Sequence, residues 1–286
     1  MSKKVLIASD STTDLSAELI EKYDIKILPL GVNLGDKSYL DGVDINPDMI
    51  YAHYEKCGEL PKTAAANVAD FTDFFKKYTD EGYALVMFTI TQSMSSTFNN
   101  GRMAAEEFED VYVVDTKNLS TGGGLLVLAA ADMAAQGKSA AEIAEACAEM
   151  ADRVDASFIV DDLEFLYKGG RCSALAAFGA NLLQLKPCIM VRDGKMGVGK
   201  KYRGKFAATL EKYIADQIGD ASDVELDRIF VTHAGCDKEI YMACAEQVKK
   251  LAPFKEVLIT RAGCTISSHC GRNTLGVLFV HKNKLV

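Results

Sequence analysis

The 286-residue sequence has no apolar run long enough to span a bilayer, no low-complexity segment and no internal repeat. The net charge is -8, and no basic stripe is present that could neutralise nucleic-acid phosphates. The first residues lead directly into a predicted strand, so we expect no signal peptide. These absences favour a cytoplasmic protein without a nucleic-acid partner, one that spans no membrane and touches a membrane surface at most transiently.

Familiar catalytic and metal-binding signatures are also missing. The eight cysteines include no C-x-x-C pair, which predicts reduced thiols in a chain this large. No G-x-S-x-G elbow is present. Gly194 to Lys200 nearly spells a phosphate-binding loop, but Lys201 stands where a magnesium-binding hydroxyl belongs. A metal site is conceivable, by residue type, from His233, Cys236, Cys264, His269 and Cys270, but their spacing fits no familiar zinc pattern. We therefore predict no metal site and no cofactor.

The order of apolar segments predicts an α/β fold in two domains. Strands and helices alternate up to about residue 160, which is typical of a parallel sheet. The segments Cys188–Arg192 and Met196–Tyr202 flank Asp193-Gly194, a hairpin signal that adds antiparallel pairing. We therefore predict a parallel-sheet N-terminal domain over residues 1–155 and a mixed-sheet C-terminal α/β domain over residues 156–286.

A hydroxyl-rich turn follows the most apolar predicted strand. Tyr83–Ile90 is an unbroken apolar and β-branched run, typical of a strand buried on both faces. Helical residues from Phe98 follow the turn, so free backbone N–H groups would lie beside several hydroxyls, an arrangement that suits an anion. Helix capping by Ser95 and Ser96 is the alternative. The turn contains Thr91, Gln92, Ser93, Ser95, Ser96 and Thr97.

Three other polar features are candidate ligand contacts. A polar cluster from Asp10 to Asp14 follows the first predicted strand, where open α/β sheets bind ligands. His269 falls in a small, polar segment that we predict to be a loop, where it would contact a ligand or hydrogen-bond the loop itself. Arg171 follows Gly169-Gly170, where its guanidinium would reach an anion or the last carbonyls of the preceding helix.

Several segments together resemble the DegV family, and the resemblance spans nearly the whole chain. Its most specific part is the run L-x-K-G-G-R ending at Arg171, followed by Lys186-Pro187. The other matching segments are Asp10-Ser11-x-Thr13-Asp14-Leu15, Pro29-Leu30, Tyr39-x-Asp41-Gly42, Lys62-Thr63, Ser95-x-Thr97-Phe98, Val114-Asp115 and His269-x-Gly271.

The resemblance implies a bacterial fatty acid-binding protein, the acyl-carrying subunit that works with a separate fatty acid kinase. It implies that Thr63, Ser95 and Ser96 hold the carboxylate of a long-chain fatty acid, with His269 close by. Arg171 and Arg203 would face the kinase or the phosphate that it adds. The apolar stretch from Ala174 to Leu183 would be a wall of the acyl tunnel; an ordinary core helix is the alternative.

On this hypothesis the protein has no catalytic residues of its own. A rival hypothesis is an enzyme, a small-molecule phosphotransferase or an acyl hydrolase, that uses Ser95 as nucleophile and His269 as base.

Overall fold

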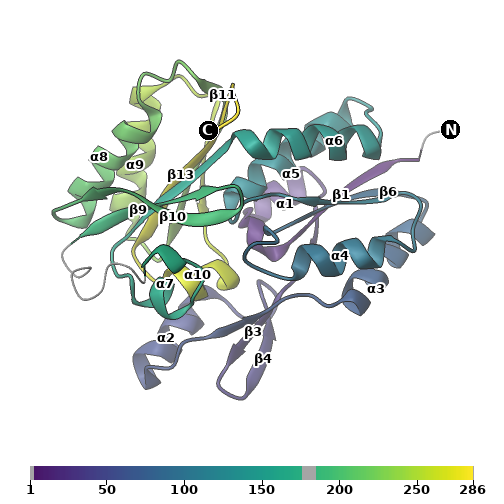
Figure 1. The fold of residues 1–286 in the computed structure, drawn as a ribbon, viewed down its shortest axis with the longest axis horizontal. Coiled ribbons are helices and arrows are strands. Elements are labelled where there is room, and N and C mark those ends of the chain that lie inside the picture. Colours follow the sequence, from purple (N-terminus) through teal and green to yellow (C-terminus); the bar gives the residue numbers. More distant parts are fainter. Residues whose placement is uncertain (1–2, 176–184, 286) are drawn as a thin grey trace.

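The computed structural model describes residues 3–175 and 185–285 (Figure 1). Its N-terminal part contains a four-stranded parallel sheet. The strand order is β2-β1-β6-β7. All six residues of β6 are buried because helices cover both faces of the sheet. The strands are β1 (Val5–Asp10), β2 (Lys26–Leu28), β6 (Ala84–Thr89) and β7 (Val111–Asp115), and the helices around them are α1 (Ala17–Lys22), α3 (Val68–Asp80), α4 (Thr97–Ala105), α5 (Thr121–Ala135) and α6 (Ala140–Met150).

Local sequence signals explain where these helices begin. The Ser16 side chain accepts a hydrogen bond from the backbone N–H of Leu19 at the start of α1. Asn67 and Ser139 each form a reciprocal capping box, with Asp70 in α3 and Glu142 in α6. Side-chain hydrogen bonds within a few residues therefore determine where these helices begin.

The C-terminal part contains a six-stranded mixed sheet in the order β10-β9-β8-β13-β11-β12. Only β11 and β12 pair in parallel, and the β9–β10 hairpin turns at Asp193-Gly194 as predicted. The α8 and α9 helices cover one face, and α5 packs on the other. The elements are β8 (Val154–Val160), β9 (Lys186–Arg192), β10 (Lys195–Tyr202), α8 (Phe206–Ile218), β11 (Val224–Ala234), α9 (Lys238–Leu251), β12 (Glu256–Arg261) and β13 (Thr274–His281).

A small antiparallel sheet, β4-β3-β5, lies beneath both larger sheets (Figure 1). The apolar segment over residues 27–32 predicts a single strand and the small, polar segment over residues 62–67 predicts a loop, and both predictions are wrong. Pro29 interrupts the first segment, and Thr63 instead pairs with Val32 of the new sheet. The elements are β3 (Gly31–Leu34), β4 (Lys37–Leu40), β5 (Lys62–Ala64), α2 (Pro47–Cys57), α7 (Glu164–Lys168) and α10 (Cys264–Cys270).

The α5 helix lies between the two large sheets and joins their cores. One continuous cluster of buried apolar residues contains Val86 of β6, Leu126 of α5 and Leu278 of β13. The glycines that begin α5 allow this close packing, since a Cβ on Gly124 would lie 3.0 Å from the Thr13 carbonyl oxygen. The α/β class with a parallel and a mixed sheet is confirmed, whereas a domain division at residue 155 stays a prediction.

No helix within residues 3–175 and 185–285 has the length and apolar character needed to cross a bilayer.

Candidate functional site

A cavity of about 320 Å³ opens where β6 ends and α4 begins. Its volume is within the range of small-molecule sites. Apolar side chains form most of its wall: Leu30, Ile90, Met94, Leu119, Phe158, Leu166, Met196 and Ile266. Five of the six predicted site residues also line it, namely Thr63, Ser95, Ser96, Arg171 and His269. The structure therefore gathers residues from distant parts of the sequence around one space.

A second, apolar hollow of about 30 Å³ adjoins this cavity. The two hollows share four lining residues, namely Leu119, Phe158, Ile266 and Cys270. The second one continues past them to Gly276 and Leu278 of β13. The larger cavity thus carries hydroxyls, and the smaller hollow on the other side of the shared residues is apolar. The predicted tunnel wall over residues 174–183 lies, from residue 176 on, outside the described residues.

His269 lies on α10 and not in a loop, which corrects the prediction from its small, polar neighbours. A hydrogen bond joins His269 Nε2 to Thr63 Oγ1 over 2.9 Å. Burial, together with the charge of Arg171, lowers the pKa of His269 to about 4, so the imidazole is neutral at pH 7. Its Nδ1 atom is buried and has no hydrogen-bond partner among the described residues.

The double glycine before Arg171 makes room for this imidazole. A Cβ on Gly169 would lie 2.7 Å from His269 Nδ1. Glycine is therefore required at the end of α7 for the ring to occupy its place. Arg171 donates from Nη1 to the Gly169 carbonyl over 2.8 Å, which is the helix-end contact that was one of its two alternatives. It also lines the cavity, and its contact with an anion stays a prediction.

Ser95 and Ser96 differ in their roles at the start of α4. Ser95 Oγ accepts from the Thr97 backbone N–H over 3.2 Å and lies 2.7 Å from Thr97 Oγ1. Ser96 is the residue before the helix, is exposed, and makes no capping hydrogen bond through its side chain. Capping thus explains part of the role of Ser95 and none of the role of Ser96.

Buried aspartates position the site without lining the cavity. Asp10 accepts from the Ile90 backbone N–H over 2.8 Å, where the hydroxyl-rich turn begins. Asp41 accepts from the backbone N–H groups of Cys264 (2.7 Å) and Thr265 (2.9 Å) and so holds α10 in place. Burial raises the pKa of Asp10 to about 6. The polar cluster after β1 therefore supports the site structurally. The role of Asp41 has no direct signal in the sequence, because its partners lie more than 200 residues away along the chain.

Arg203 is the one predicted site residue away from the cavity. It is exposed in the segment between β10 and α8.

The geometry does not suit the hydrolase alternative. His269 Nε2 bonds Thr63, whereas the hydrogen bonds of Ser95 Oγ among the described residues are with Thr97. Because its Nδ1 lacks a partner there, no carboxylate orients the ring as in a nucleophile–base–acid arrangement.

Acidification is expected to destabilise the ligand-free protein through His269. Its pKa is about 4 in the folded protein and has an ordinary value of 6.5. Between these values the unfolded chain binds a proton that the folded chain excludes, so this contribution to stability falls as the pH drops from 6.5 towards 4. We expect the free energy of unfolding of the wild type, measured in urea, to fall by about 1 to 2 kcal/mol more than that of His269→Asn between pH 7 and pH 5.

Subtracting the unfolding free energy of one protein from that of the other cancels the contributions of Asp10 and the other acids, which both proteins share. A difference that stays constant over this pH range would mean that His269 accepts a proton in the folded state.

Comparisons with known proteins cover almost the whole chain. A model of the DegV family matches residues 4–282. A DegV domain-containing protein from Clostridium acetobutylicum is 33% identical over 98% of this chain and 99% of its own. A structure described as fatty acid binding of a DegV family protein from Thermus thermophilus has a TM-score of 0.88 at 27% identity, covering 97% of this chain and 99% of that one.

A stearic acid-binding protein from Eubacterium ventriosum has a TM-score of 0.83 at 27% identity, with 99% of each chain covered. Similarity in fold therefore extends to proteins crystallised as fatty acid binders.

Proposed function

This chain belongs to the DegV family, and from that premise we propose that it binds a long-chain fatty acid and presents its carboxylate to a partner kinase for phosphorylation. One observation carries the proposal: a cavity lined by hydroxyls lies beside an apolar hollow, and the two share four lining residues. Such a space matches a molecule with one charged end and an apolar body. Similar structures from Thermus thermophilus and Eubacterium ventriosum, described as fatty acid-binding, support the same ligand class.

The acyl tail would supply most of the affinity. Transferring each methylene from water to an apolar environment contributes about 0.8 kcal/mol. Leu119, Phe158 and Ile266 contact both hollows, so a chain that passes between them would be enclosed by apolar side chains. We propose that the tail runs from the rim past these residues towards β13.

The rim would orient the carboxylate through hydrogen bonds. Thr63, Ser95 and Ser96 each bring a hydroxyl to the cavity, and a carboxylate accepts several such bonds. His269 would donate from Nε2 to Thr63 Oγ1 and so leave the hydrogen of the Thr63 hydroxyl for the carboxylate, and the exposed guanidinium of Arg171 would add positive charge. These donors meet the requirement that a partly buried carboxylate be paired or hydrogen-bonded.

The open rim would leave the carboxylate accessible to a second protein. Ser96 and Arg171 are exposed beside the cavity, and Arg203 is exposed on the segment after β10. We propose that the two arginines face the kinase or the phosphate that it transfers, since guanidinium groups pair well with phosphate oxygens. The kinase would supply the catalytic residues, and its ATP-dependent step would take place in the cytoplasm.

Mass spectrometry of the denatured, freshly purified protein is expected to detect about one fatty acid per chain. An empty protein that hydrolyses acyl esters would instead support the enzyme with Ser95 as nucleophile.

When the loaded protein is mixed with a fatty acid kinase and ATP, an acyl phosphate should form. Replacing Arg203, which does not line the cavity, with Glu should sharply reduce that product and leave the bound fatty acid in place; undiminished product in this variant would contradict the kinase-facing role of Arg203.

A further inference from the structure

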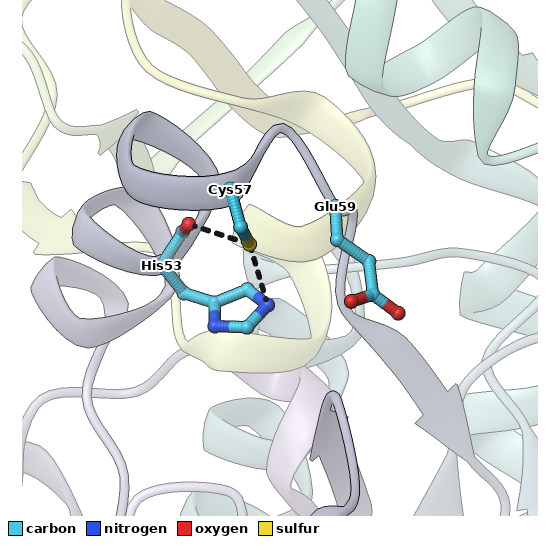
Figure 2. A group of neighbouring side chains, drawn as sticks. All are labelled: His53, Cys57 and Glu59. Carbon is cyan, nitrogen blue, oxygen red and sulfur yellow. Dashed lines mark hydrogen bonds between the residues drawn. The ribbon is translucent and has the colours of Figure 1, made fainter.

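The C-terminal turn of α2 carries a histidine and a cysteine on one face. His53 and Cys57 are four residues apart, so their side chains lie on the same side of the helix. Cys57 Sγ is 3.3 Å from His53 Nε2 and also donates to the His53 carbonyl oxygen over 3.1 Å. Figure 2 shows the thiol and the imidazole directed towards each other at the end of the helix.

The end of the helix brings a carboxylate to the same place. Gly58 has a φ of 68°, and its N–H donates to the Tyr54 carbonyl over 2.8 Å, which ends α2 in a sharp turn. The buried Pro61 then fixes the direction of the exit segment. Glu59 therefore lies next to the last helical turn, and its carboxylate, the Cys57 thiol and the His53 imidazole have ligand atoms within 4.8 Å of one another (Figure 2).

We propose that His53, Cys57 and Glu59 bind a divalent transition-metal ion, Zn²⁺ above all. In tetrahedral zinc sites the Zn–S distance is about 2.3 Å and the Zn–N distance about 2.0 to 2.1 Å, which places the sulfur and nitrogen about 3.5 Å apart. The observed 3.3 Å separation is close to that value. Thiolate and imidazole favour zinc over calcium or magnesium, which prefer oxygen ligands. Three protein ligands leave the fourth position to water or to another ligand.

Cys57 is the one cysteine suited to this role. All eight cysteines lie within the described residues, and the other seven are buried. Burial raises the pKa of each of those seven thiols, which disfavours the thiolate that a metal requires. None of the three proposed ligands lines the cavity, so this site is independent of the proposed fatty acid site.

Titration of the full-length, reduced protein with Co²⁺ tests the site, because a thiolate ligand gives a sulfur-to-cobalt charge-transfer band in the near ultraviolet. We expect the band to appear at one equivalent of Co²⁺ and to disappear when Zn²⁺ displaces it. Cys57→Ser should abolish the band. His53→Gln and Glu59→Gln should each weaken Zn²⁺ binding by at least about tenfold. Loss of a residue that only supports a metal ligand typically weakens metal binding about 10- to 100-fold, and loss of a ligand itself should weaken it at least as much.

Glu55→Gln is the matched control, because Glu55 is exposed on the same helix and pairs with Arg272 over 3.5 Å, outside the proposed ligand set. It should bind Zn²⁺ as the wild type does. The proposal is overturned if the wild type gives no band, if the band persists in Cys57→Ser, or if Zn²⁺ affinity is unchanged in His53→Gln.

Discussion

Replacing Thr63 with Val and Ser95 with Ala together is expected to weaken fatty acid binding by at least about 100-fold. Each substitution removes a hydroxyl from the cavity rim, and a hydrogen bond to a charged group contributes about 1.5 to 3 kcal/mol. Two such losses correspond to a factor of about 100 or more in the dissociation constant. The measurement is isothermal titration calorimetry of the delipidated protein with a soluble fatty acid.

Two comparisons make this result specific to the carboxylate. Ser93→Ala removes an exposed hydroxyl from the same turn, and Ser93 is absent from the residues that line the cavity, so this variant should bind like the wild type. Because the substitutions leave the apolar hollow unchanged, the loss should be similar for acids of different length. Unchanged affinity in the double variant would show that the carboxylate is held elsewhere.

Ile266→Trp is expected to weaken binding of long-chain fatty acids by about 100-fold and to spare short ones. Ile266 lies on α10 and lines both hollows, so a larger side chain there would block the proposed path of the tail from one to the other. Excluding about four methylenes from the interior costs about 3 kcal/mol. The measurement is a series of dissociation constants over increasing acyl chain length.

The shape of this series separates blockage from a general loss of structure. In the wild type, affinity should rise with each methylene; in Ile266→Trp it should stop rising once the chain reaches the obstruction. Val43→Trp, at a side chain that is 68% exposed, is the control for adding an indole ring. If Ile266→Trp follows the wild-type series over its whole length, the tail does not pass between the hollows.

The parallel sheet and the turn after β6 could be predicted because their signals are local. The apolar run of β6 and the polar residues after it lie within one short segment, and Asp193-Gly194 by itself indicates the β9–β10 hairpin. The hydroxyls of Thr63, Ser95 and Ser96, together with His269, could be predicted as site residues from their residue types and from the resemblance to a family. Their meeting around one cavity depends on long-range packing.

Long-range interactions also explain why α10 and β5 were wrongly predicted to be loops. Cys264–Cys270 is rich in Ser, Thr and Cys, which are poor helix formers, yet it forms α10 because Asp41 caps its first N–H groups from far away in the sequence. The β5 strand exists because β3 offers it an edge. The candidate metal ligands could not be predicted from a familiar cysteine and histidine spacing, because it is the turn at Gly58 that brings Glu59 to His53 and Cys57.

The central claim is that the hydroxyl-bearing rim holds the carboxylate of a fatty acid whose tail lies inside the protein. The crystal structure of the protein as purified, without delipidation, tests this most directly. The account predicts a continuous tube of electron density with its carboxylate between Thr63 and Ser95 and its tail running past Ile266 towards β13. Density in the opposite orientation, or a space filled solely by the protein's own side chains, would contradict it.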